Sequence, residues 1–260
     1  MLSPTYYKVS VRANNEITSL IREMVDNAPS SVVTHNAKFF LPFINRRMQS
    51  LLILLEEDLV WDAEIIMRSV VEATIKYSFI LSNTEKIEDR SNEFWNDWAE
   101  VNSLEQSKRA SLVLQLLEGK KDIKEHLSSV ILDEEHRKKL ENNWANKKIR
   151  QLKSDWSYGN MVRTLSKDID LAPLIGLLHG YGMGSHLIHA DETGIGIEAE
   201  RLQRSSDEIK TFNTLHFQRI LSDVIAFVYF FGHITAKALH QDTAQMRIIF
   251  EQFNEDKKKT

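Results

Sequence analysis

The chain has 260 residues, of which 42% are hydrophobic and 27% charged, and its formal net charge is −4. These values are ordinary for a globular protein and exclude the overall basic charge that marks many nucleic-acid-binding proteins. Because the chain has no cysteine, disulfides, thiolate nucleophiles and cysteine-ligated zinc are excluded. The N-terminus has neither the basic nor the apolar region of a signal peptide, and no apolar run approaches the roughly 18 residues of a membrane span. We therefore expect a cytoplasmic protein without membrane association.

Helical periodicity dominates the chain. It contains only nine glycines and four prolines, which argues against a turn-rich β fold. Hydrophobic spacing predicts amphipathic helices over residues 14–27 and 35–57. A tight connection then leads into a helix over residues 60–81, and we expect these last two helices to form an antiparallel hairpin.

Residues 60–81 are apolar on nearly every side of their helical projection, which is typical of a buried helix. Charged residues nevertheless recur every four positions along it, at Glu64, Arg68, Glu72 and Lys76. Buried charges are either paired or put to use. One interpretation is a charge ladder that sets the register between helices. The other is a site in which Arg68 binds a phosphate or carboxylate and Glu72 orients it.

Residues 84–155 differ from this core in composition. Acidic and basic residues alternate densely, and apolar residues thin to single stripes. We expect a charged helical excursion within a single all-α domain that spans residues 1–260. Most of this charge is interpreted as a solvated helix face, and the basic cluster near residues 147–153 leaves a partner or RNA surface as the alternative.

A further helix is predicted over residues 171–190. Gly176, Gly180 and Gly184 are spaced by four within it. Since each glycine costs about 1 kcal/mol of helix propensity relative to alanine, this spacing suggests that another backbone or a ligand comes close. Residues 191–200 are expected to form a surface loop or lid. Long, largely apolar helices are predicted over 206–241 and, more briefly, over 243–253.

Tyr181, Ser185 and His189 also lie four residues apart, on a neighbouring face of the helix predicted over 171–190. They form either a polar seam or a site in which His189 moves a proton near neutral pH. His186 lies three residues before His189, and a metal hydrolase that uses both is a third interpretation, but the His-Glu-x-x-His pattern of zinc hydrolases is absent and no metal site is expected. Gly180-Tyr-Gly-Met-Gly-Ser follows no strand, which argues against a nucleotide-binding loop, and we expect no cofactor.

Two motifs together resemble a bacterial, all-helical family of unknown function. They are Arg68-Ser-Val-Val-Glu72 and, far downstream, Tyr181-x-x-x-Ser185-x-x-x-His189, and the resemblance covers about residues 35–240. Such proteins look like distant relatives of the HEPN superfamily, whose helical bundles often dimerise and act as metal-independent ribonucleases in toxin–antitoxin or phage-defence systems. The resemblance implies a catalytic centre of Arg68, Glu72, Ser185 and His189, with binding residues at Tyr181, Lys76 and His186.

In such a centre the arginine would hold the scissile phosphate. The histidine would move the proton during attack by the ribose 2′-hydroxyl, which confines the substrate to RNA. Active HEPN nucleases usually carry arginine followed four to six residues later by histidine on one helix. None of the nine histidines here has an arginine at that distance before it, so the centre would be assembled from two helices.

Two functions therefore fit the sequence. The first is a HEPN-like endoribonuclease effector of a toxin or phage-defence system, expected to be a homodimer with RNA and a cognate antitoxin or defence protein as partners. The alternative is a non-catalytic helical module that binds a protein or a small ligand through the same polar pocket.

Overall fold

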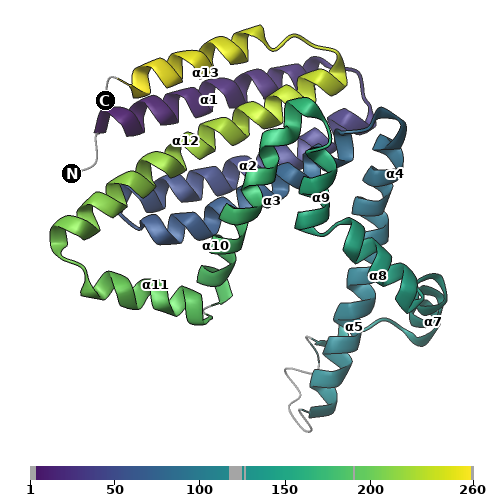
Figure 1. Ribbon diagram of the computed structural model, residues 1–260. Helices are drawn as coiled ribbons and strands as arrows, with labels where there is room; N and C mark the ends of the chain where they lie inside the picture. The colour runs from purple at the N-terminus through teal and green to yellow at the C-terminus, as the bar shows by residue number, and fades with distance from the viewer. Residues whose placement is uncertain (1–3, 117–124, 126, 190, 259–260) are drawn as a thin grey trace. The chain divides into compact units, whose positions relative to one another are not determined.

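The computed structural model describes residues 4–116, 125, 127–189 and 191–258. Within these ranges the chain forms helices and no strands (Figure 1), which confirms the prediction of an all-α, multi-helix fold. The chain divides into two compact units. The core unit comprises Met1–Ile87 and Met161–Thr260, and the inserted unit comprises Glu88–Asn160, close to the excursion predicted over 84–155.

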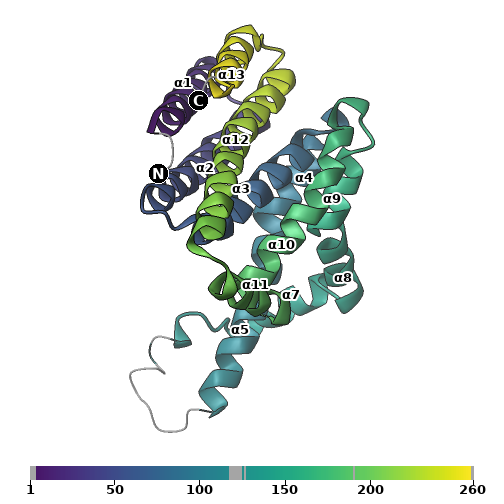
Figure 2. The same ribbon diagram turned by 60° about the vertical axis from the view of Figure 1, so that its left-hand side comes forward.

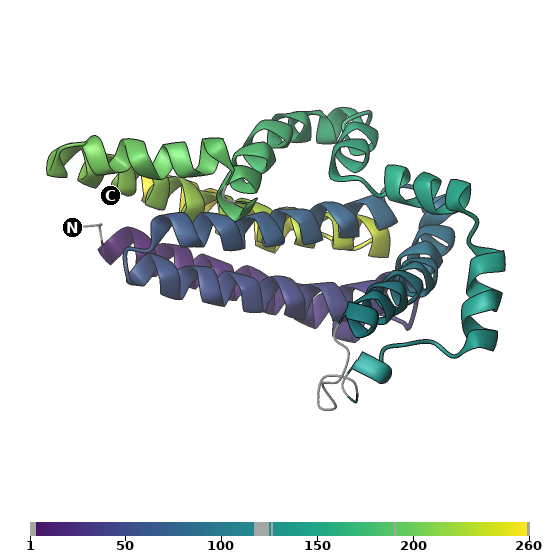
Figure 3. The same ribbon diagram turned by 90° about the horizontal axis from the view of Figure 1, so that it is seen from below.

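Five long helices build the core unit: α1 (Pro4–Asn27), α2 (Val32–Glu56), α3 (Val60–Leu81), α12 (Ser206–Leu239) and α13 (Ala244–Lys257). α12 contacts each of the other four; Figure 1 shows it between the α1–α13 pair and the α2–α3 pair, and Figure 2 shows it crossing in front of α2. α2 and α3 form the predicted hairpin, visible as two blue helices running side by side in Figure 3.

Local signals set the ends of α2. Ser31 caps its first turn, because its hydroxyl accepts a hydrogen bond from the Thr34 backbone nitrogen while the Thr34 hydroxyl accepts one from the Ser31 nitrogen. At the other end, Asp58 adopts a left-handed conformation with φ of 59°. Aspartate tolerates this conformation better than most residues, so it turns the chain directly into α3.

The centre of the core unit is aromatic. Tyr77 of α3 is fully buried, and its ring stacks on Phe231 of α12 at 4.1 Å between centroids and packs at a tilt against Phe40 of α2 at 5.5 Å. The Tyr77 hydroxyl lies 2.8 Å from the hydroxyl of Thr235, which satisfies both buried groups. These contacts tie three helices together and stabilise the position of α3.

Gly232 allows α12 to approach two neighbours closely. A Cβ atom at this position would lie 2.7 Å from Sδ of Met246 in α13 and 2.9 Å from the side chain of Ile21 in α1. These distances are shorter than van der Waals contact, so a larger residue would force the side chains of Met246 and Ile21 to shift.

α12 is also the one helix among the described residues that is long and apolar enough to cross a membrane. Of its most apolar 18-residue window, 61% is buried within the protein. Burial against α1, α3 and α13 accounts for this apolar character, since a helix surrounded by other helices is apolar on most sides.

The inserted unit holds α5 (Trp98–Leu116), α7 (Glu134–Asn143), α8 (Asn146–Asp155) and a π-helical stretch at Glu93–Asp97, and it includes most of α4 (Ile87–Asn92) and the start of α9 (Tyr158–Leu165). Its tryptophans organise it: the indole nitrogen of Trp156 donates to Glu93 at 3.0 Å, and that of Trp144 donates to Glu100 at 2.7 Å. The basic residues of α8 are exposed, and Lys153 pairs with Glu105 at 2.5 Å. The described contacts thus neutralise part of the predicted basic cluster.

The segment after residue 168 differs from the prediction in two respects. Residues Ile169–Gly176 form a 3-10 helix, and the α-helix α10 begins only at Leu177 and ends at His189. Residues 191–200 are not a loop, because α11 (Glu192–Gln203) starts there. Its N-cap is Asp191, whose carboxylate accepts a hydrogen bond from the Gly194 nitrogen at 3.1 Å, and this cap outweighs the two glycines that suggested a loop.

At Gly176 a Cβ atom would meet nothing within 4 Å, so no other backbone of the described chain comes close there. The surroundings of Gly180 and Gly184 lie outside the described residues. The close approach occurs instead at Gly194, where a Cβ atom would lie 2.3 Å from the carbonyl oxygen of His186. A glycine of α11 therefore allows its backbone to lie directly against that of α10.

Candidate functional site

α3 and α10 pack against each other and bring together the side chains of Arg68, Glu72, Lys76 and Tyr181, which we call the Arg68 centre. Nη2 of Arg68 donates to the Tyr181 hydroxyl at 2.9 Å, and that hydroxyl donates to Oε2 of Glu72 at 3.2 Å. Nζ of Lys76 donates to the other carboxylate oxygen at 2.6 Å. Arginine and glutamate, one turn apart on α3, are thus bridged by a phenol from α10.

The Arg68 guanidinium is positioned by a ring as well as by a hydrogen bond. Its central carbon lies 4.1 Å from the centroid of the Tyr181 ring, close enough for a cation–π interaction. Its other terminal nitrogen, Nη1, is buried and has no hydrogen-bond partner in the part of the chain that the structure describes. Nη2 of the guanidinium is therefore fixed by Tyr181, and Nη1 is available to donate a hydrogen bond.

Opposing effects set the charges at this centre. Burial by itself raises the pKa of the Glu72 carboxyl. The hydrogen bond and charge of Lys76 act in the opposite direction, as do the hydrogen bond from Tyr181 and the charge of Arg68, so the pKa falls below its ordinary value. Burial, together with the charge of Glu72, raises the pKa of Tyr181 despite its hydrogen bond from Arg68. With two cations and one anion, the centre carries one net positive charge at neutral pH.

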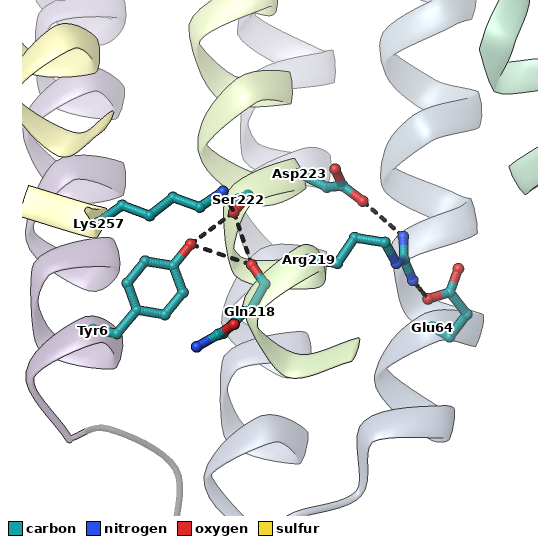
Figure 4. A network of polar contacts seen from close by, with 7 residues as sticks. All are labelled: Tyr6, Glu64, Gln218, Arg219, Ser222, Asp223 and Lys257. Atoms are coloured by element: carbon teal, nitrogen blue, oxygen red, sulfur yellow. Dashed lines mark hydrogen bonds and ion pairs between the residues drawn. The ribbon is translucent and has the colours of Figure 1, made fainter. Parts of the chain in front are cut away.

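Glu64 does not continue this cluster, so the ladder predicted along α3 is interrupted. Its carboxylate accepts a hydrogen bond from Nη2 of Arg219 on α12, and Nη1 of the same guanidinium lies 2.7 Å from Asp223 (Figure 4). Nothing in the sequence pattern pointed to Arg219. It lies 155 residues from Glu64 along the chain, and only packing of α12 against α3 brings the two together.

Ser185 and His189 continue the stripe of Tyr181 along α10, as their spacing predicts. Ser185 is partly buried and His189 is exposed. No hydrogen bond or ion pair among the described residues joins either side chain to the Arg68 centre. Eight residues separate His189 from Tyr181, which is about 12 Å along a helix axis. The structure thus brings Tyr181 to Arg68 and Glu72, and it places His189 two helical turns away.

His186 belongs to the connection between α10 and α11. Its Nδ1 lies 2.7 Å from Oδ2 of Asp191, and the two side chains are 40% and 44% exposed. Asp191 also caps α11, so this pair links the end of one helix to the start of the next. Within the described ranges, no three histidine, aspartate or glutamate side chains are grouped in a way that could hold a metal ion.

Comparison with known proteins identifies one family. The model of a family described as "Family of unknown function (DUF5677)" matches residues 37–209, a span that contains both motifs and the Arg68 centre. Comparisons with curated proteins and with solved structures found no match. Because the matched span covers more than half of the chain, this protein belongs to DUF5677, a family of unknown function.

Proposed function

We propose that the protein is a helical module that binds an anionic group, a phosphate or a carboxylate, at the Arg68 centre. The observation that carries this proposal is the buried Nη1 of Arg68, which lacks a partner among the described residues while Nη2 is fixed by Tyr181. A buried donor without a partner costs about 1–3 kcal/mol, which an oxygen of the ligand would recover. The net positive charge of the centre and the planar fork of arginine favour the same ligands.

The protonation states of the centre suit binding better than proton transfer. The lowered pKa of Glu72 makes this carboxylate a weak base, and both of its oxygens already accept hydrogen bonds. The raised pKa of Tyr181 keeps its hydroxyl protonated at neutral pH. The residues around Arg68 are therefore arranged to hold an anion in place rather than to react with it.

A ribonuclease activity is the second candidate, and one observation favours it. α10 continues from Tyr181 through Ser185 to His189, so the stripe that contacts Arg68 also carries a hydroxyl and an accessible imidazole. An extended RNA strand held at Arg68 would have to reach His189 about 12 Å further along the helix. In this proposal the protein is a cytoplasmic, homodimeric, HEPN-like effector of a toxin or defence system, with RNA and a cognate antitoxin or defence protein as partners.

Calorimetric titration with inorganic phosphate and with a short single-stranded RNA tests the binding proposal. We expect Arg68→Gln to weaken binding at least tenfold, because it removes the charge and the planar fork. Arg12→Gln is the matched control, since Arg12 is 61% exposed and lies on α1. Thermal unfolding shows whether each variant is folded. Equal affinities of the wild type and a folded Arg68→Gln variant would reject the proposal.

RNA integrity and growth on expression of the protein test the ribonuclease candidate. Cleavage that His189→Ala and Arg68→Gln both abolish, while the exposed-histidine control His136→Ala leaves it intact, would support an active site that spans α3 and α10. Cleavage that persists in His189→Ala would place the reaction elsewhere. If the wild type binds RNA and leaves it intact, only the binding function stands.

A further inference from the structure

A second site lies on the core unit where α3, α10, α11 and α12 meet, away from the Arg68 centre. It is a cavity of about 360 Å³, within the range of small-molecule sites. The residues that matter most for its chemistry are Trp61, Arg201, Arg204, Phe212, His216 and Arg219. We call it the Trp61 pocket, and none of its lining residues belongs to the Arg68 centre.

Aromatic rings and arginines pack against one another in this pocket. The rings of Trp61 and His216 lie 4.5 Å apart between centroids. The guanidinium of Arg201 lies 5.3 Å from the Trp61 ring, and that of Arg204 lies 3.8 Å from the Phe212 ring. Flat side chains in this arrangement offer faces on which a planar ligand ring can stack.

The charged residues of the Trp61 pocket indicate that an anionic part of a ligand would bind there. Three arginines line the Trp61 pocket, against two glutamates. A neighbouring cavity of about 420 Å³ shares Trp61, Leu187 and Arg201 with it, and the other charged residues of its lining are Asp58, Asp62 and Glu198. Trp61 and Arg201 separate the two cavities. The Trp61 pocket, which contains Arg204 and Arg219, is therefore the cavity that attracts an anion, and the neighbouring acidic cavity repels one.

The pKa of His216 is consistent with a positive electrostatic potential in the pocket. Burial lowers its pKa, and the positive charges of Arg219 and Arg201 lower it further, against the opposite effect of Glu64. The imidazole is therefore neutral at pH 7. Its Nδ1 and the indole nitrogen of Trp61 are both buried without a hydrogen-bond partner in the described part of the chain. A small displacement of the two rings would offer these polar atoms to the edge of a heterocycle.

A phosphate at the pocket would have to replace the carboxylates that these arginines bond now. Arg204, 22% exposed, bonds Glu200, which is 65% exposed, and Arg219, 44% exposed, bonds Glu64, which is 14% exposed, and Asp223 (Figure 4). Each pair has one member open to solvent, so exchanging it costs less than breaking a fully buried pair. A phosphate, which accepts charge-assisted hydrogen bonds from two guanidinium groups at once, can displace them.

We propose that the Trp61 pocket binds a planar heterocycle that carries a phosphate, a ligand of the size and chemistry of a nucleoside monophosphate. The heterocycle stacks beside Trp61 and Phe212, and Arg204 and Arg219 hold the phosphate. This site is independent of the anion proposed at Arg68, because the two share no residue.

Quenching of tryptophan fluorescence and calorimetry on the full chain, with adenosine 5′-monophosphate as the probe, test this proposal. Adenosine alone and inorganic phosphate alone are separate arms. We expect the nucleotide to bind at least tenfold more tightly than either part, since stacking and charge act together. Equal binding of adenosine and the nucleotide would overturn the role of the arginines. Equal binding of phosphate and the nucleotide would overturn the role of the rings.

Variants then locate the ligand. We expect Arg204→Gln and Trp61→Phe each to weaken nucleotide binding, the former about tenfold, with Arg12→Gln as the unaffected control. Arg204 is the C-cap residue of α11, with a side chain 22% exposed, and thermal unfolding shows whether each variant is folded. A loss caused by Arg68→Gln but not by Arg204→Gln would assign the nucleotide to the Arg68 centre and overturn the proposal.

Discussion

The Arg68 centre and the Trp61 pocket both use arginine on or beside α3, but they hold it in different ways. At the centre, a phenol from α10 bridges Arg68 and Glu72, and these side chains are partly buried. At the pocket, Arg204 bonds the exposed carboxylate of Glu200 directly, and Arg219, itself exposed, bonds Glu64 and Asp223 directly. The difference matters because a buried charge that loses its partner is costly, whereas an ion pair with one exposed member is more easily exchanged for a ligand.

The largest expected effect separates the two regions by stability. We expect Glu72→Ala to lower the free energy of unfolding by about 2 kcal/mol, because Lys76 and Tyr181 lose a shared acceptor and Arg68 loses a nearby negative charge. Glu200→Ala at the pocket should change it by less than about 0.5 kcal/mol. Urea denaturation followed by circular dichroism measures both. Similar losses of unfolding free energy in the two variants would contradict the proposed difference in stability between the Arg68 centre and the Trp61 pocket.

Gly194→Ala tests the backbone contact between α10 and α11. The added methyl group would meet the His186 carbonyl, so we expect a loss of about 1.5 kcal/mol and weaker nucleotide binding, because α11 carries Arg201 and ends next to Arg204. Gly196→Ala is a matched control on the same helix, where a Cβ atom meets nothing within 4 Å. That variant should be as stable as the wild type or more stable by up to about 1 kcal/mol. If both variants behave alike in denaturation, the close approach is not present.

Tyr181→Phe isolates the phenol bridge. It keeps the ring against the Arg68 guanidinium and removes only the hydroxyl between arginine and glutamate. We expect a loss of about 1 kcal/mol in unfolding free energy and weaker phosphate binding at the centre, with nucleotide binding at the pocket unchanged. Parallel titrations of the two ligands measure this, and a change in nucleotide affinity would mean that the sites are coupled.

The smallest effect is a difference in pH dependence. The pKa of Glu72 is lowered on folding, so its stabilising contribution is present above its ordinary pKa of about 4.3 and is lost as the pH falls through the lower, folded value. The pKa of His216 is also lowered, so the unfolded state takes up its proton first and stability falls as the pH drops below about 6.5.

Difference titrations separate these two windows. Comparing wild type with Glu72→Gln should show a stability difference that shrinks only below about pH 4. Comparing wild type with His216→Gln should show a difference in unfolding free energy that changes as the pH falls below about 6.5. The change should be less than about 1.4 kcal/mol for each pH unit. If the pH dependence of stability is unchanged in both variants, it arises from other groups.

The local spacing of hydrophobic residues in the sequence predicted much of the fold. The periodicity of residues 60–81 predicted α3, and the helices predicted over 35–57 and 206–241 agree closely with α2 and α12. The failure at residues 191–200 has a specific cause, because two glycines suggested a loop where the Asp191 cap starts a helix. Helices and caps depend on residues a few positions apart, so sequence spacing carries most of the information about them.

The Arg68 centre was predicted in part for the same reason. Spacing of four placed Glu72 beside Lys76 on one face of α3, and the structure shows that pair. The register of α10 against α3 was not readable from spacing, and it decides that Tyr181 reaches the arginine while His189 lies two turns away.

By itself, the sequence determined that this protein is helical, that α3 is buried, and which polar residues interrupt its apolar surface. Tertiary structure alone decided that Glu64 meets Arg219 and that Trp61, Arg204 and His216 share a pocket. The physical reason is that side chains three or four residues apart meet through the geometry of one helix. Side chains more than a hundred residues apart meet only where the burial of apolar faces sets the register between helices.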